Sequence, residues 1–264
     1  MIRPRIDRVV REAVLVSLAV AVVAAATGAL WLSATRVASD PPLFGFVAWT
    51  LAGAAATASL ALAMSRLFRR ESERQRLPSL GLPNALTLVR FVLIAPAVVL
   101  LLEGRYPEAL ACYVVLSATD VADGIVARRR KAVSEFGVVA DPLADVLSTF
   151  AIFTVFLARG WCPLWLYVLL ASRYAMLFLG SFFLFLATGP FSFRATVPGK
   201  IVGVVQAAGA CLVIAGAMVG GLDPSTERVL FAFLGIGFAS IVLSQAVIGW
   251  RLARRRVSPS GPTG

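Results

Sequence analysis

Eight apolar stretches, each close to the length of about 20 residues that a membrane-spanning helix needs, follow one another along this chain. Inside a bilayer the backbone polar groups must be satisfied within each segment, and an α-helix does this. Hydrophobic residues make up 59% of the chain and charged residues 15%, against about 45 to 50% and 25% in soluble domains. The sequence therefore predicts an all-α polytopic membrane protein with eight spans, at residues 13–32, 43–64, 84–102, 108–127, 137–157, 164–186, 201–220 and 229–250.

The polar segments divide the chain into three predicted parts. Residues 1–83 form a two-helix membrane extension that ends in a basic linker, residues 84–250 form a six-helix core, and residues 251–264 form a disordered basic tail rich in Ser, Pro and Gly. The first apolar stretch also fits a cleavable signal peptide, although it is longer than a usual signal core. The topology of the later spans is the same in either case.

The net charge of +11 reflects orientation in the membrane. With alternating sides, 19 of the 25 Lys and Arg residues fall on one side of the predicted spans, as the positive-inside rule requires of the cytoplasmic side. We therefore expect no nucleic-acid partner and an inner-membrane protein with this side in the cytoplasm. Cys112, Cys162 and Cys211 lie in or beside apolar segments without metal-like spacing, and we interpret them as packing residues.

Four carboxylates lie around the turn between the fourth and fifth predicted spans. Asp120 and Asp123 are three residues apart, and Asp141 and Asp145 are four apart, so each pair shares one face of a helix. Facing carboxylates repel each other unless cations or protons intervene. Oxygen-only ligands, in a chain without His, suit Mg²⁺ or Mn²⁺, and two such ions can support phosphoryl transfer. The simpler interpretation is that these are helix-end charges balanced by nearby arginines.

Other residues of the same stretch fit a phosphate ligand. Gly124 and Ala127 leave room for a ligand to approach the helix, and Arg128 can form paired hydrogen bonds with a phosphate. Gly137 allows the second helix to pack closely.

Two further polar features lie within predicted spans. Asn84, Thr87 and Arg90 share one face at the start of the third span, and a polar stripe in a membrane helix indicates a functional site; a helix cap with a snorkelling Arg is the alternative. Arg173 interrupts the sixth span, so we expect it to face a polar cavity or, alternatively, to pair with a neighbouring carboxylate.

The acidic stretch resembles the signature of the CDP-alcohol phosphotransferase family, D-x2-D-G-x2-A-R-x8-G-x3-D-x3-D. All eight fixed positions are present: Asp120, Asp123, Gly124, Ala127, Arg128, Gly137, Asp141 and Asp145. The run from Asn84 to Arg90 is similar to the N-x-x-T-x-x-R entry to the family's first core helix. The resemblance covers residues 84–250 and implies the family's six-helix core, preceded here by two additional helices.

The resemblance also implies a reaction. A CDP-linked donor lipid, commonly CDP-diacylglycerol, would pass its phosphatidyl group to a small alcohol acceptor and release CMP, and a homodimer is expected by analogy. Asp145 would be the general base. Two Mg²⁺ or Mn²⁺ ions would bind to Asp120, Asp123, Asp141 and Asp145. The donor would bind to Gly124, Arg128 and Ser134, together with Asn84 and Thr87. An anionic acceptor would bind to Arg173, Arg194 and Lys200.

Within the family, Gly199-Lys200 and Gln206 are similar to the phosphatidylglycerophosphate synthase branch, whose acceptor is glycerol 3-phosphate. The chain departs from that branch at Val146, where the branch has Lys, at Tyr174, where it has Glu, and after Lys200, where it has a second Lys and a Thr. Phosphatidylglycerol and inositol phosphate are alternative acceptors. A transporter lined by intramembrane Asp and Arg would instead show inverted repeats or broken helices, and an inactive scaffold would not need four intact aspartates.

Overall fold

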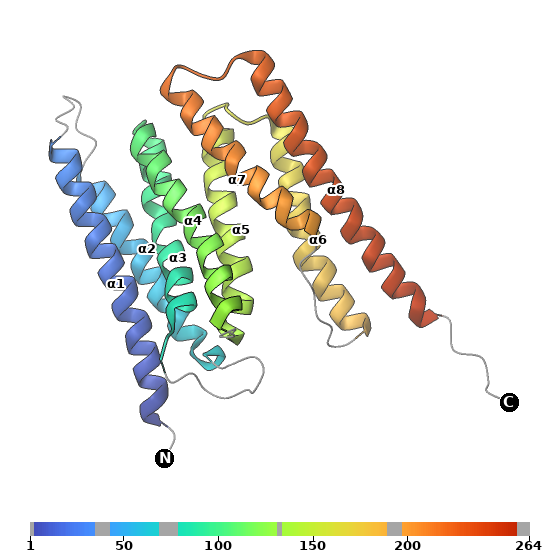
Figure 1. The fold of residues 1–264 in the computed structure, drawn as a ribbon, viewed down its shortest axis with the longest axis horizontal. Coiled ribbons are helices and arrows are strands. Elements are labelled where there is room, and N and C mark those ends of the chain that lie inside the picture. Colours follow the sequence, from blue (N-terminus) through green and yellow to red (C-terminus); the bar gives the residue numbers. More distant parts are fainter. Residues whose placement is uncertain (1–2, 35–42, 69–78, 131–133, 189–196, 258–264) are drawn as a thin grey trace. The chain divides into compact units, whose positions relative to one another are not determined.

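The computed structural model describes residues 3–34, 43–68, 79–130, 134–188 and 197–257. The secondary structure of these residues consists of eight α-helices and one short 3-10 helix, η1 (Figure 1). Their bounds are α1 (Arg3–Ala34), α2 (Leu43–Ala63), η1 (Ser65–Leu67), α3 (Leu82–Leu102), α4 (Tyr106–Arg130), α5 (Glu135–Ala158), α6 (Leu164–Thr188), α7 (Val197–Met218) and α8 (Pro224–Val257).

Six of the helices contain, within the described residues, a stretch long and apolar enough to cross a membrane. Of the other two, α6 has a shorter apolar stretch, Leu164–Leu177, and the side chains of α4 are described only as far as Asp120. The prediction of an all-α polytopic membrane protein is confirmed, and the chain is an integral membrane protein. The number of eight spans stays a prediction. The six stretches are Arg8–Ala26, Phe46–Ala63, Leu82–Leu102, Glu135–Ala158, Ile201–Met218 and Pro224–Val247.

Several helices extend beyond the apolar stretches that predicted them. Helix α8 begins at Pro224, because Asp223 caps its N-terminus: the carboxylate accepts hydrogen bonds from the backbone N–H groups of Ser225 at 3.1 Å and Thr226 at 3.2 Å. The Ser225 hydroxyl and these N–H groups stabilise the ionised form and hold the pKa of Asp223 below its usual value. At its other end α8 continues to Val257, so residues 251–257 of the tail predicted to be disordered are helical.

The chain forms two compact units, Met1–Val155 and Phe156–Gly264. In the first unit, α1 and α2 pack against each other and against α3, and α3 packs along α4. In the second unit, α8 packs against both α6 and α7.

One hydrophobic cluster in the first unit joins the N-terminal extension to the helices that carry the acidic signature. The Phe68 ring, which follows η1, stacks on the Phe136 ring in the first turn of α5 with centroids 4.5 Å apart. The Glu12 carboxylate of α1 accepts a hydrogen bond of 2.9 Å from the backbone N–H of Leu80, just before α3. The buried members of the cluster are Val9, Ala13, Ala61, Phe68, Leu80, Leu88, Phe91, Phe136, Ala140 and Ala144.

Candidate active site

The polar face predicted at the start of α3 is buried in the first unit. Asn84 is 4% exposed, and Thr87 and Arg90 are each 1% exposed. Their spacing of three residues places them on one side of the helix. Burial of three polar side chains side by side is costly unless each has partners, and the partners lie on α4 and α5.

Asn84 is joined to the N-terminus of α5 through Ser134. The Ser134 hydroxyl donates a hydrogen bond of 2.6 Å to Asn84 Oδ1 and accepts one of 3.0 Å from the backbone N–H of Gly137. Asn84 Nδ2 in turn donates to the backbone carbonyl of Leu80 at 2.7 Å. Ser134 therefore acts as the N-cap of α5 and fixes this helix end against α3.

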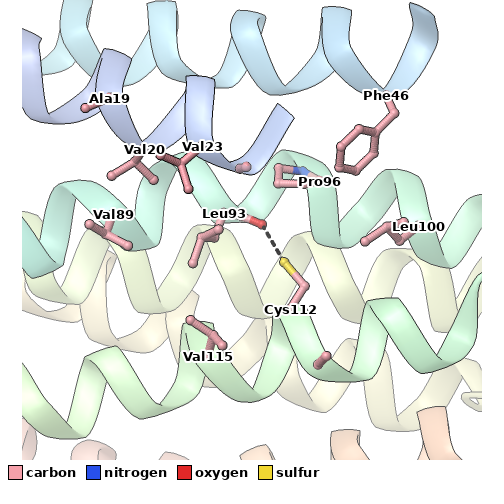
Figure 2. Close-up of a pocket in the computed structure, with 12 residues that line it drawn as sticks. Ala19, Val20, Val23, Phe46, Val89, Leu93, Pro96, Leu100, Cys112 and Val115 are labelled. Atoms are coloured by element: carbon pink, nitrogen blue, oxygen red, sulfur yellow. Dashed lines mark hydrogen bonds between the residues drawn. The ribbon is translucent and has the colours of Figure 1, made fainter. Parts of the chain in front are cut away.

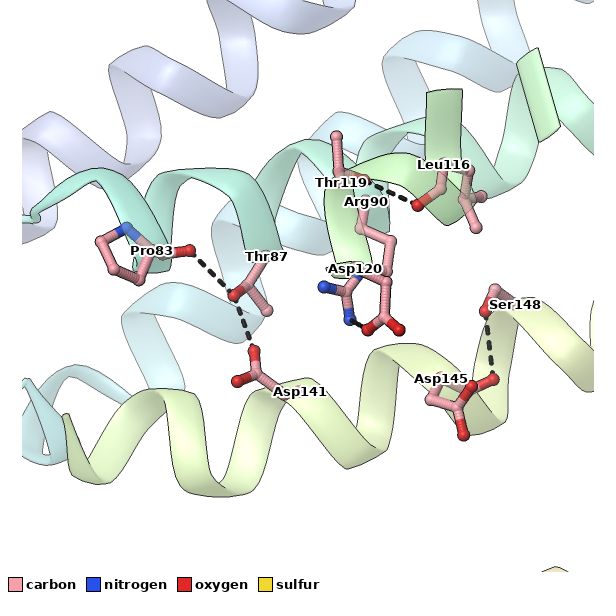
Figure 3. A network of polar contacts seen from close by, with 9 residues as sticks. All are labelled: Pro83, Thr87, Arg90, Leu116, Thr119, Asp120, Asp141, Asp145 and Ser148. Atoms are coloured by element: carbon pink, nitrogen blue, oxygen red, sulfur yellow. Dashed lines mark hydrogen bonds and ion pairs between the residues drawn. The ribbon is translucent and has the colours of Figure 1, made fainter. Parts of the chain in front are cut away.

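Thr87 contacts the third aspartate of the signature directly. Its hydroxyl lies 2.7 Å from Asp141 Oδ1 and 3.1 Å from the carbonyl oxygen of Pro83 (Figure 3). The single hydroxyl proton is shared unequally, because the carboxylate is the closer acceptor and a charged one. Thr87 thus orients the Asp141 carboxylate toward α3.

Arg90 pairs with the first aspartate of the signature. Its Nη1 lies 2.8 Å from Asp120 Oδ1, and the side chain of Asp120 is 52% exposed, so the pair joins a fully buried cation to a carboxylate at the surface (Figure 3). Asp141 on α5 interacts electrostatically with both Arg90 and Asp120: the guanidinium attracts its carboxylate, and the carboxylate of Asp120 repels it. Arg90 is the largest fully buried side chain among the described residues.

Asp145 lies one turn beyond Asp141 on α5 and is partly exposed (Figure 3). Its backbone carbonyl accepts a hydrogen bond of 3.0 Å from the Ser148 hydroxyl. Gly137 lies one turn before Asp141, and a Cβ at this glycine would come within 3.3 Å of Ser134 Oγ and 3.6 Å of Asp141 Oδ2. The same Cβ would lie 3.6 Å from Asn84 Oδ1 on α3, so a larger side chain at this position would crowd the polar contacts between α3 and α5.

The remaining signature residues lie on α4, whose side chains from residue 121 to 130 are outside the described part of the chain. Asp123, Gly124, Ala127 and Arg128 belong to this segment, of which only the helical backbone is described. Their predicted roles in metal and donor binding stay predictions.

The donor atoms around Asp120 and Asp141 suit a hard divalent ion. Within the described part of the chain, Arg90 contacts Asp120 through Oδ1, and Thr87 contacts Asp141 through Oδ1. Residues with described side chains do not bring three or more His, Cys, Asp or Glu together as a metal site, but Asp123 is not among them. A set of carboxylate oxygens from two helices fits Mg²⁺ or Mn²⁺.

The residues predicted to bind the acceptor belong to the second unit. Arg173 on α6 donates a hydrogen bond of 2.5 Å to Gln206 Oε1 on α7, and its guanidinium lies over the rings of Tyr174 and Phe238, 5.0 and 5.6 Å from their centroids. Its contacts in the described part of the second unit are therefore an amide and two aromatic faces rather than the carboxylate considered as an alternative. Arg194 and the side chain of Lys200 lie outside the described residues.

The sequence predicts that Arg90 lies on the polar face of α3, and the structure adds its pairing with Asp120. A single available signal pointed to a pairing of this kind: an arginine inside an apolar span must find a partner there. Which aspartate it pairs with depends on the rotation of α4 against α3, which the spacing along one helix does not specify.

The chain is similar to known proteins over the region that carries this site. Residues 80–250 match the family model of CDP-alcohol phosphatidyltransferases. Over 108 residues the chain is 30% identical to the CDP-diacylglycerol--glycerol-3-phosphate 3-phosphatidyltransferase of Bacillus subtilis (strain 168), covering 35% of this chain and 56% of that one. The enzyme of the same description from Aquifex aeolicus (strain VF5) is 32% identical over 108 residues, covering 40% of this chain and 60% of that one.

The chain thus spans less than two thirds of the length of these two curated relatives. No solved structure matches it. The family model, in contrast, covers α3 to α7 and α8 as far as residue 250, and it includes every position of the acidic signature. The chain belongs to the CDP-alcohol phosphatidyltransferase family.

Proposed function

We propose that this protein transfers a phosphatidyl group from a CDP-linked lipid, CDP-diacylglycerol, to glycerol 3-phosphate and releases CMP, as a step of phospholipid biosynthesis. The observation that carries the proposal is the acidic hairpin of α4 and α5, in which Arg90 holds Asp120 and Thr87 holds Asp141. Membership of the family supports the reaction class, and the descriptions of two relatives support the donor and the acceptor.

The four signature aspartates, Asp120, Asp123, Asp141 and Asp145, would hold two Mg²⁺ or Mn²⁺ ions. When bound, these ions would neutralise the diphosphate and the leaving CMP and would make the acceptor hydroxyl more acidic. Thr87 and Arg90 maintain the carboxylates of α4 and α5 in one place despite their mutual repulsion. In this role the polar face of α3 supports the metal site.

Asp145 would act as the general base of the transfer. Its carboxylate accepts the proton of the acceptor hydroxyl, the acceptor oxygen forms a bond to the phosphorus of the phosphatidyl group, and the bond from that phosphorus to CMP breaks. The electron pair of the broken bond leaves on the CMP oxygen. Asp145 is partly exposed, which suits a group that must meet a diffusing acceptor.

Gly124, Arg128 and Ser134 would contact the CDP moiety, with Asn84 and Thr87 beside them. Ser134 and Asn84 already bond to each other across α5 and α3, so this edge is pre-formed before the donor binds. Arg173, Arg194 and Lys200 would bind the phosphate of the acceptor through charge-assisted hydrogen bonds. Phosphatidylglycerol or inositol phosphate in place of glycerol 3-phosphate would use the same chemistry.

The proposed setting is the inner membrane, with the acidic hairpin at its cytoplasmic face, where a nucleotide-bearing lipid is available. The positive-inside distribution of Lys and Arg supports this orientation. The three-part division at residues 83 and 250, with 84–250 as the catalytic core, and the homodimer are likewise proposals.

The test is release of CMP from CDP-diacylglycerol by the purified full-length protein with Mg²⁺ or Mn²⁺. Glycerol 3-phosphate, inositol phosphate, serine and phosphatidylglycerol are offered separately. Asp145→Asn removes the base at constant size, and Asp223→Asn is the matched control, since Asp223 only caps α8.

We expect metal-dependent CMP release with glycerol 3-phosphate, its loss in Asp145→Asn, and normal release in Asp223→Asn. Turnover with another acceptor would correct the acceptor alone. If the folded protein neither binds nor cleaves CDP-diacylglycerol in the presence of metal, the proposed reaction is wrong.

A further inference from the structure

An apolar groove of about 550 Å³ lies in the first unit between α1, α2, α3 and α4 (Figure 2). Twelve residues line it, and none of them is charged. At its centre the Cys112 thiol of α4 donates a hydrogen bond of 3.7 Å to the backbone carbonyl of Leu93 on α3. The lining residues are Ala19, Val20, Val23, Ala24, Phe46, Val89, Leu93, Pro96, Leu100, Ala111, Cys112 and Val115.

The groove opens sideways along helices that have the composition of membrane spans. Val23 is 61% exposed on α1 and Val115 is 50% exposed on α4, so its two edges face the surroundings of the helices. In a membrane these surroundings are lipid hydrocarbon, and water has no polar partner in such a groove. An apolar chain from the bilayer can therefore enter from the side.

The length of the groove matches one leaflet. Its lining on α3 extends from Val89 to Leu100, a rise of roughly 16 Å at 1.5 Å per residue. Half of a hydrocarbon core of about 30 Å has a similar depth. One acyl chain, lying along the helix axes, would occupy it.

The groove lies on the side of α3 opposite to the acidic site, and on α4 it is centred on a different face from Asp120. On α3, Val89, Leu93, Pro96 and Leu100 lie on the side opposite to Thr87, roughly 150° around the helix at 100° per residue. On α4, Ala111 and Val115 lie roughly 180° and 140° from Asp120 by the same spacing, and Cys112 lies roughly 80° from it. A lipid in the groove therefore has its head group away from the aspartates, and it is a resident lipid rather than the reacting donor.

An exposed arginine lies on α1 beyond the groove, toward the N-terminus. Arg8 lies on the same face of α1 as Ala19, eleven residues or roughly 16 Å toward the N-terminus, and its side chain is 69% exposed. Its Nε is paired with Glu12 at 3.0 Å, and the remaining N–H groups of the guanidinium can bind a phosphate. Arg11, one turn away, is also exposed.

We propose that this groove holds one acyl chain of an anionic phospholipid, whose phosphate lies at Arg8. The lipid fills the space between the N-terminal extension and the first two helices of the catalytic core. It is distinct from the donor lipid, and its binding does not depend on the proposed reaction.

The proposal can be tested by measuring which lipids the protein retains. The full-length protein is reconstituted in bilayers of equal phosphatidylglycerol and phosphatidylcholine, extracted with a mild detergent, and analysed by native mass spectrometry for lipids bound per chain. Ala19→Phe and Ala111→Phe fill the groove from two different helices. Ala55→Phe is the matched control, because it makes the same change at an exposed alanine of α2 outside the groove.

The wild type and Ala55→Phe should retain phosphatidylglycerol, and both groove variants should retain about tenfold less because the chain loses its apolar contacts. Arg8→Gln should reduce the preference for phosphatidylglycerol over phosphatidylcholine about fivefold, as expected for one cation near the surface. Arg228→Gln, which removes an exposed charge at the start of α8, should leave that preference unchanged.

Equal retention by the wild type and both groove variants would overturn the proposal, as would a wild type that retains no lipid. Loss of a protein dimer in both groove variants, with lipid retention unchanged, would show that the groove is an interface between two copies of the chain. An unchanged preference in Arg8→Gln would overturn the assignment of the head group. Thermal melting of each variant establishes that the protein tested is folded.

Discussion

Thr87 is expected to act through Asp141, and removal of its hydroxyl tests this directly. Thr87→Val keeps the shape of the side chain and deletes the donor that lies 2.7 Å from Asp141 Oδ1. A hydrogen bond to a charged group contributes about 1.5 to 3 kcal/mol to stability. Because Asp141 is partly exposed and water can replace part of this contact, we expect the free energy of unfolding to fall by about 1 to 2 kcal/mol.

The larger effect should be on metal affinity. A residue that orients a metal ligand typically changes metal affinity or activity by about 10- to 100-fold when it is lost. We therefore expect the Mg²⁺ concentration for half-maximal CMP release to rise about tenfold in Thr87→Val and to return toward the wild-type value in Thr87→Ser. The assay is CMP release at saturating CDP-diacylglycerol, titrated with Mg²⁺, alongside equilibrium unfolding in detergent without metal.

Thr57→Val is the matched control, because it makes the same substitution at another buried threonine. Thr57 is also buried, but its hydroxyl donates within α2 to the carbonyl of Gly53 at 2.8 Å, so this variant should leave the metal titration unchanged. A double-mutant cycle of Thr87→Val with Asp141→Asn should show a coupling of about 1 to 2 kcal/mol. A Thr87→Val protein with a normal metal titration and a raised KM for the donor would refute the reasoning and assign Thr87 to direct donor contact.

Three further predictions concern other described residues. Gly137→Ala should change the free energy of unfolding by less than about 1 kcal/mol, because the helical preference for Ala offsets the close contact of the added Cβ with Ser134 Oγ at 3.3 Å. CMP release by this variant should nevertheless fall, and full activity would contradict the prediction. Gln206→Leu should lower the free energy of unfolding, measured by SDS titration, by about 1.5 to 3 kcal/mol, because it removes the amide that accepts from Arg173. Gln206→Glu should keep the acceptor and the stability in the same assay. A Leu variant as stable as the wild type would refute the assignment. Burial raises the pKa of the Cys162 thiol to about 11. At pH 8 this cysteine should therefore resist N-ethylmaleimide in the native protein and react only when the protein is unfolded. The assay is mass spectrometry of the Cys162 peptide, and rapid labelling of the native protein would contradict the burial of this thiol.

The sequence was sufficient to predict the helices because length and hydropathy determine what can cross a bilayer. It was less informative at the helix ends. Asp223 and Ser134 each cap a helix, so α8 and α5 begin before the apolar stretches that predicted them. Cap contacts depend on the local backbone, which hydropathy does not describe.

Residue spacing predicted which side chains share a face, but not which face of another helix they meet. The polar stripe of α3 was predictable from its period of three, whereas the pairing of Arg90 with Asp120 and of Thr87 with Asp141 depends on the rotation of α4 and α5. The same limit applies to Arg173, whose partners in the described part of the second unit come from α7, from α8 and from its own helix. Relative rotation is set by packing over the whole interface.

The contact of Phe68 with Phe136 has a consequence for engineering this chain. Phe68 precedes the residues that the family model matches, yet its ring covers the first turn of the helix that carries Asp141 and Asp145. Glu12 similarly supplies the acceptor for the backbone N–H that leads into α3. A version shortened to residues 84–250 would expose the Phe136 ring. It would also lose Leu80, whose N–H bonds to Glu12 and whose carbonyl accepts a hydrogen bond from Asn84. The first two helices are therefore not interchangeable with an unrelated membrane anchor: a chimera would have to rebuild both contacts before it could be compared with the intact protein.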